Sequence, residues 1–109
     1  MKNKMRDEIK FNKPKLETLI ASAMNEASTF DLRGWYLPLE LDLTTLEFLK
    51  PSWTNGNGYT PGFLTVCKVG MFDPEGKNIE ELIELHLENA QIRIENYFQF
   101  QKSKKVVWI

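Results

Sequence analysis

The last quarter of the chain, from Asn78 to about Lys102, constrains the fold more than any other stretch because it predicts one long amphipathic helix. Its apolar residues recur at spacings of three and four, which places them on one broad face. They are Ile79, Leu82, Ile83, Leu87, Ala90, Ile94, Tyr97 and Phe98. A continuous helix of this length would extend about 37 Å at 1.5 Å per residue. The rest of a small domain must therefore pack against its apolar face.

Two features set the limits of this helix. Asn78 is suited to cap its first turn, with Glu81 at the third helical position. Beyond Ala90 the apolar residues also alternate as they would in a strand, so a change from helix to strand near Gln91 is an alternative. Because no glycine or proline marks such a break, the pattern favours a continuous helix.

A second group of apolar residues lies off the main stripe of this helix. Leu85, Ile92 and Phe100 fall close together on the adjacent flank, and a helix that is apolar around so much of its girth usually has a partner there too. The chain also ends on four apolar residues, which predicts a short terminal strand or a patch buried against a partner. We therefore expect an interface that includes Leu85, Ile92, Phe100 and Trp108.

The first part of the chain predicts an arm followed by a helix. Residues 1–12 are polar and basic, and they form either a flexible arm or, from Glu8 to Phe11, a short edge strand. Pro14 suits the first turn of a helix because its missing N–H is not needed there. Apolar residues at helical spacing then predict a first helix that ends near Ser28.

Apolar and polar residues alternate from Trp35 to Thr44, which is the clearest strand pattern in the chain. One face of this strand belongs in the core and the other faces water, as in an antiparallel sheet that is covered on one side. Pro38 cannot donate a ladder hydrogen bond, so the strand lies at an edge or carries a bulge. An exposed edge could pair with a second chain, but Pro38 and the outward acids Glu40 and Asp42 disfavour this.

Two further segments complete the predicted fold. Thr44 and Glu47 match a capping box, which favours a short helix or turn before Pro51 over a second strand. Residues 63–72 are apolar and rich in β-branched side chains, which predicts a buried, central strand followed by a turn at 73–76. The prediction is one α+β domain over 1–109, with an N-terminal helix, a small antiparallel sheet and the long C-terminal helix packed across one sheet face.

The loop over 52–62 is the candidate ligand-binding segment. Two aromatic rings bracket two Asn-Gly pairs, and flat rings with side-chain amides suit sugar rings, nucleobases or a protein partner. Trp53 could instead fold back and cap the core, which is the simpler interpretation. The segment lacks the glycine pattern of a nucleotide-phosphate loop. The candidate surface residues are Trp53, Asn55, Asn57 and Tyr59, with Tyr36 on the outer face of the preceding strand.

Nothing in the sequence predicts catalysis, a metal site or a cofactor. His86 is the single histidine and has no carboxylate within one helical turn, so a structural role is favoured over a general base. Cys67 lies in an apolar strand, where a free cysteine behaves as a small hydrophobe, and a Cys67–His86 nucleophile pair has no local support. Glu40 and Asp42 fall on the water-facing side of the alternating strand, which accounts for both acids without a divalent cation.

Composition places the chain among globular proteins. It has 109 residues, 42% of them apolar and 27% charged, with a net charge of −1, so no overall field favours nucleic acid or an anionic membrane. A single cysteine precludes an intrachain disulfide, and no apolar run matches a membrane span or a signal peptide. These features predict a cytoplasmic protein.

The expected function is that of a small non-enzymatic binding protein, acting through self-association as a homodimer or through a protein partner. The size, the near-neutral charge and the lack of a catalytic motif are typical of a phage or bacterial accessory or inhibitor protein. The alternative is a small-ligand binder, for a nucleotide or a sugar, that uses the aromatic loop over 52–62.

Overall fold

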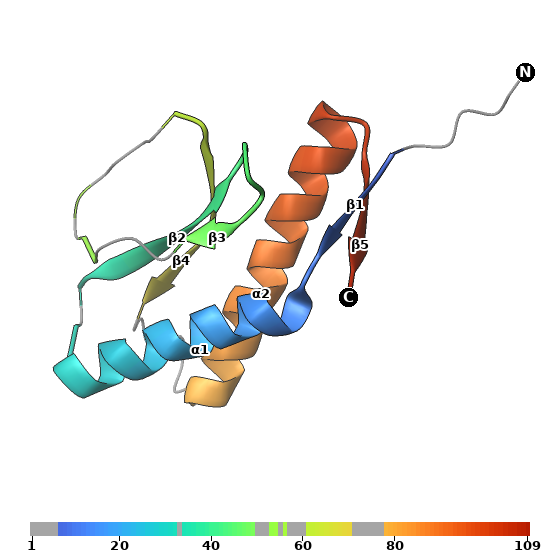
Figure 1. Cartoon of the computed structure of the whole chain (residues 1–109). Coiled ribbons are helices and arrows are strands. Elements are labelled where there is room, and N and C mark those ends of the chain that lie inside the picture. The colour runs from blue at the N-terminus through green and yellow to red at the C-terminus, as the bar shows by residue number, and fades with distance from the viewer. Residues whose placement is uncertain (1–6, 33, 50–52, 55, 57–60, 71–77) are drawn as a thin grey trace, which may run out of the picture.

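The structure is a computed structural model that describes residues 7–32, 34–49, 53–54, 56, 61–70 and 78–109. In chain order its elements are β1 (Glu8–Phe11), α1 (Lys13–Phe30), β2 (Tyr36–Asp42), β3 (Phe48–Leu49), β4 (Phe63–Gly70), α2 (Ile79–Asn96), the π-helical turn η1 (Tyr97–Gln101) and β5 (Lys105–Trp108) (Figure 1). The predicted α+β class is confirmed. Neither α1 nor α2 carries the long apolar stretch that crossing a lipid bilayer requires.

Helix α1 forms where the apolar spacing predicts it. The Asn12 side chain accepts a hydrogen bond from the Lys15 N–H at 2.9 Å, and Asp31 closes the other end in the left-handed conformation. Its buried stripe consists of Leu16, Ile20, Ala23, Met24 and Ala27.

Helix α2 begins with the predicted capping box, in which Asn78 and Glu81 exchange side-chain to backbone hydrogen bonds. The helix passes Gln91 without a break and continues into η1, so the alternative of a strand from Gln91 is wrong. The physical reason is burial, because Ile94 and Phe98 stay on the core stripe at a helical spacing of four.

The three-stranded antiparallel sheet has the order β3-β2-β4, with β2 in the middle. The expected edge position of the strand with Pro38 is therefore wrong, and the bulge of this strand pair lies in β4 and not in the strand with Pro38. Leu39 pairs with Cys67 and Glu40 with Thr65, which leaves Val66 as the extra residue of β4.

The backbone alternation of β2 explains why a proline is tolerated in a central strand. The Tyr36 N–H donates to the Thr54 carbonyl at 2.8 Å, on the side away from β4, whereas the Leu43 N–H donates to Gly62 at 3.0 Å. The backbone N–H and C=O groups of odd-numbered residues in β2 thus point toward β4, and those of even-numbered residues point to the opposite side of the strand. The Pro38 nitrogen therefore points away from β4, and the pairing of β2 with β4 loses no hydrogen bond.

Two other predictions about the sheet are corrected. Strand β4 was expected to be central, but within the described residues no strand pairs with its second edge. The segment after β2 is a turn followed by the short strand β3, not a capped helix, because Asp42 Oδ1 accepts the N–H groups of Thr44 and Thr45 at 2.8 and 3.2 Å. The predicted turn at 73–76 lies outside the described residues.

The two ends of the described chain meet in a parallel pair, β1 with β5. Ile109 donates its N–H to the Phe11 carbonyl at 2.9 Å. Residues 8–11 are thus a strand and not a free arm, and the C-terminal residues form the predicted terminal strand. Phe11 is 3% exposed, and its ring lies 5.5 to 6.0 Å from the rings of Phe48, Phe98 and Trp108.

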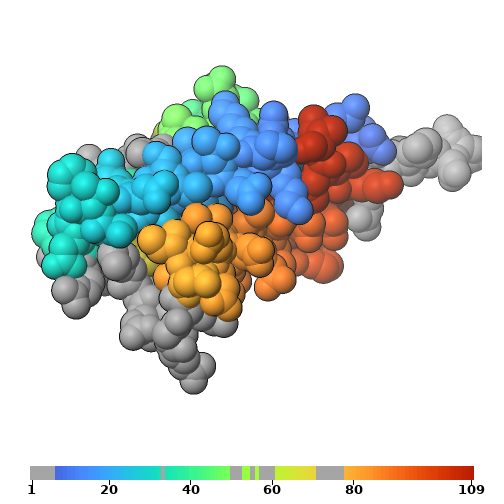
Figure 2. Space-filling model, turned by 90° about the horizontal axis from the view of Figure 1, so that it is seen from below, coloured from blue at the N-terminus to red at the C-terminus, as the bar shows by residue number. Residues whose placement is uncertain are grey.

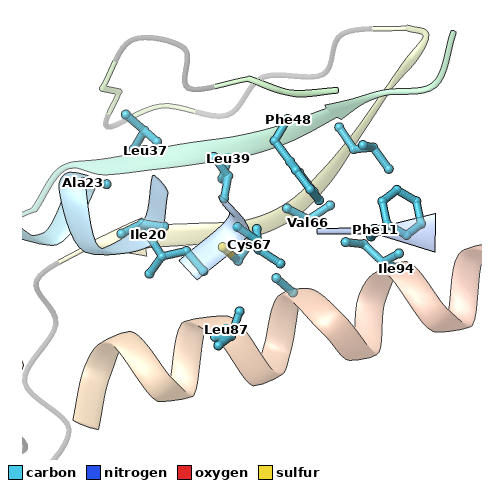
Figure 3. Close-up of a cluster of buried hydrophobic side chains, with 14 of the residues drawn as sticks. Phe11, Ile20, Ala23, Leu37, Leu39, Phe48, Val66, Cys67, Leu87 and Ile94 are labelled. Atoms are coloured by element: carbon cyan, nitrogen blue, oxygen red, sulfur yellow. The ribbon is translucent and has the colours of Figure 1, made fainter. Parts of the chain in front are cut away.

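The core lies between the sheet and the two helices. The labelled side chains of Figure 3 converge from β2, β4, α1 and α2, with Phe11 closing one end. From the helix side, Figure 2 shows α1 and α2 next to one another, in agreement with their direct contact. The inner residues of β2, which are Leu37, Leu39 and Leu41, are at most 1% exposed. The sheet is thus covered on this face by both helices.

Candidate functional site

The flank of α2 that carries Leu85, Ile92 and Phe100, called here the α2 flank, presents apolar side chains to solvent. Phe100 is 78% exposed and Ile92 is 48% exposed, whereas Leu85 is half-buried. Fully burying such a side chain is worth about 1.5–3 kcal/mol. Two large exposed side chains on one side of one helix therefore mark a surface that gains free energy when it is covered.

The π-helical turn explains how Phe100 joins this flank. Leu85 and Ile92 are seven residues apart, which is nearly two α-helical turns, but Ile92 and Phe100 are eight apart. A π turn has i→i+5 hydrogen bonds and so takes about one extra residue. Because η1 covers Tyr97–Gln101, the eight-residue step returns Phe100 to the line of Leu85 and Ile92. Single π turns often occur at functional sites.

A cleft of 630 Å³ lies beside the α2 flank, between β4 and α2. Its walls are mixed: Thr65, Val66 and Lys68 come from β4, and Asn89, Ile92, Arg93 and Asn96 come from α2. A second hollow continues it toward Phe100 and shares Arg93 and Asn96. The cleft runs along the edge of β4 that has no strand partner among the described residues. An aromatic and an arginine beside apolar contacts are typical of protein interfaces.

The sequence predicted Ile92 and Phe100 for this site but not its polar side. Asn89, Arg93 and Asn96 follow one another at spacings of four and three, which is the helical signal that would have placed them on one stripe.

Cys67 and His86 line the same cleft, but their ionisation does not fit a nucleophile and base. Burial raises the pKa of the Cys67 thiol to about 12. Burial also lowers the pKa of His86, against the smaller opposing effect of a hydrogen bond with the Gly70 backbone. A thiolate–imidazolium pair needs the reverse of both shifts. Burial therefore disfavours the charged forms of both groups.

We expect Cys67 to react at least a hundredfold more slowly with iodoacetamide in the native protein than in urea at pH 7.5, because the thiolate is the reactive form and an ordinary thiol has a pKa near 8.5. The chain has one cysteine, so mass spectrometry of the alkylated protein reports this thiol alone and the unfolded chain serves as its own control. Native and unfolded rates within tenfold of each other would contradict the argument.

Two of the residues predicted for ligand binding, Trp53 and Tyr36, lie in the described part of the chain and make structural contacts there. The Trp53 indole packs against the core and donates its N–H to Glu26 Oε1 of α1. The Tyr36 hydroxyl donates to the Gly56 carbonyl at 2.5 Å, and the Lys68 ammonium lies 5.2 Å from the Tyr36 ring centre. Asn55, Asn57 and Tyr59 lie outside the described residues.

Trp108 and the strand carboxylates also serve the fold. The Trp108 N–H donates to Glu95 Oε2 at 2.7 Å, and its ring packs on Phe11. Asp42 caps the turn after β2, and Glu40 accepts the Thr65 hydroxyl at 3.3 Å. Within the described ranges no group of three His, Cys, Asp or Glu residues is placed to hold a metal ion.

Comparison with known proteins gives no relative: no family model, no curated protein and no solved structure matches this chain.

Proposed function

We propose that this protein acts by binding another protein chain, and that the α2 flank is the binding surface. The observation that carries the proposal is the exposure of Phe100 and Ile92 on one line of α2, at 78% and 48%. Both residues lie beside polar groups of the cleft, as in an interface with an apolar centre and a polar rim. Arginine and aromatic residues are enriched in such interfaces.

The surroundings favour binding over chemistry at this surface. Cys67 and His86 are the two side chains of the cleft that could act as a nucleophile and a base. Both are buried, and burial favours their neutral forms. Lys68 rests over the Tyr36 ring. A surface that offers apolar side chains, two amides and one guanidinium gains affinity by desolvating Phe100 and Ile92 and specificity from the polar groups.

Site-specific photo-crosslinking tests this proposal in living cells. With a benzophenone amino acid in place of Phe100, we expect one discrete covalent adduct, whose protein is identified by mass spectrometry. The adduct should disappear in the Ile92→Glu background, because a charge beside Phe100 opposes desolvation of the surface.

The matched control places the same photoreactive group at Phe30, which is 66% exposed at the end of α1. No discrete adduct is expected there. Absence of an adduct at Phe100, or an adduct that persists in the Ile92→Glu background, would overturn the proposed function.

A further inference from the structure

We propose that the chain that docks on the α2 flank is a second copy of this protein, with the two α2 helices antiparallel and Ile92 at the two-fold axis. This inference rests on the proposed function and names its partner. It follows from the spacing, the charge order and the amide pairs of α2.

The spacing of the α2 flank is symmetric about Ile92. Leu85 lies seven residues before it, a rise of about 10.5 Å at 1.5 Å per residue. Phe100 follows after eight residues, of which one is taken up by the extra length of the π turn. When two such helices run in opposite directions, Phe100 of each copy faces Leu85 of the other and the two Ile92 side chains meet. An isologous interface requires this self-complementarity.

The charge order of α2 selects the antiparallel arrangement. The N-terminal half carries acids, which are Glu80, Glu81, Glu84 and Glu88, and the residues that follow the helix carry Lys102, Lys104 and Lys105. Arg93 lies next to the two-fold axis and Glu95 accepts the Trp108 N–H, so neither contributes to this order. Two parallel helices would place acids beside acids and bases beside bases. The antiparallel order places the acidic half of each copy beside the basic end of the other, which favours this partner and this direction.

The amides beside the α2 flank fit the same symmetry. Asn89 and Asn96 lie on opposite sides of Ile92 along the helix, at distances of three and four residues, and both line the cleft. In the antiparallel pair, Asn89 of one copy lies within one residue of Asn96 of the other, about 1.5 Å along the helix axis. An asparagine amide is both donor and acceptor, so each pair can satisfy itself without a group from a different protein.

Cysteine variants of the purified full chain test this arrangement under mild oxidation. We expect Ile92→Cys to form a disulfide-linked dimer, and an equimolar mixture of Leu85→Cys and Phe100→Cys to form mostly the mixed disulfide. The wild type, whose Cys67 is buried, and Phe30→Cys, at the exposed end of α1, should remain unlinked.

Light scattering tests the association without any cysteine. The wild type should show the dimer mass in a concentration series that reaches about 1 mM, at the weak end of specific binding. Phe100→Glu should reduce the dimer affinity at least tenfold, and circular dichroism should remain that of the wild type because the side chain is mostly exposed.

Three results would overturn the inference. A wild-type monomer over the whole series excludes the second copy, and an adduct of another protein at Phe100 would then leave the proposed function standing. A dimer that is unaffected by Phe100→Glu uses a different surface. Homodisulfides of Leu85→Cys in place of the mixed disulfide would exclude the antiparallel order.

Discussion

Replacing Phe11 by alanine is expected to lower the free energy of unfolding by about 3–5 kcal/mol, the range measured for deleting a buried phenylalanine ring. Phe11 is 3% exposed and has ring contacts with residues of β3, η1 and β5. Its removal leaves a cavity among three other aromatic rings, which cannot all shift to fill it. A domain of this size has a stability of only about 5–15 kcal/mol in total. The variant should therefore be close to unfolding at 37 °C.

The matched control for this prediction is Phe100→Ala, which removes the same ring from a position that is 78% exposed. We expect a change within about 0.5 kcal/mol, measured by urea denaturation at a protein concentration low enough to exclude association. Equal losses in the two variants would show that β1 and β5 contribute nothing to the core. A loss below 1 kcal/mol for Phe11→Ala would lead to the same conclusion.

The regular elements of the fold were predictable because each has a local cause. The apolar spacing and the Asn78 capping box specify α2 within the sequence itself. The alternation around Leu37, Leu39 and Leu41 specifies β2 in the same way. Such features depend on residues within one or two turns, so no tertiary contact has to be known in advance.

The order of the strands was not predictable, because it depends on contacts between distant segments. Pro38 suggested an edge strand, yet β2 pairs with β4 on one side and with β3 and Thr54 on the other, and the Pro38 nitrogen points away from β4. Phe11 was placed in a flexible or edge segment because its neighbours are polar and basic. Its burial requires β5, which is almost one hundred residues further along the chain. The exposure of Ile92 and Phe100 followed from their angle on the helix, whereas the cleft beside them required the position of β4.

The second large effect concerns acid stability and comes from His86, the one histidine of the chain. Its side chain is 3% exposed, and burial lowers its pKa below the ordinary value of about 6.5, although the hydrogen bond with Gly70 acts in the opposite direction. The native protein thus holds His86 neutral under conditions where the unfolded chain protonates it.

The direction of the pH dependence follows from this difference. Above pH 6.5 neither state binds the proton, so the contribution of His86 to stability is fully present. As the pH falls below 6.5 the unfolded state binds one proton more than the native state, and the free energy of unfolding decreases. The slope approaches about 1.4 kcal/mol per pH unit and ends once the pH has passed the lowered native pKa.

Urea denaturation between about pH 5 and pH 7.5, above the range in which ordinary carboxylates titrate, measures this slope directly. The wild type should lose stability toward pH 5, whereas His86→Gln, which keeps a polar donor near Gly70 but does not titrate, should show a nearly flat profile. The variant is expected to be less stable than the wild type at pH 7.5 and to approach or exceed it at pH 5. Parallel profiles for the two proteins, or a wild type that gains stability on acidification, would mean that His86 is protonated in the native cleft. That result would also weaken the case against a charged catalytic pair with Cys67, because both conclusions depend on the same burial.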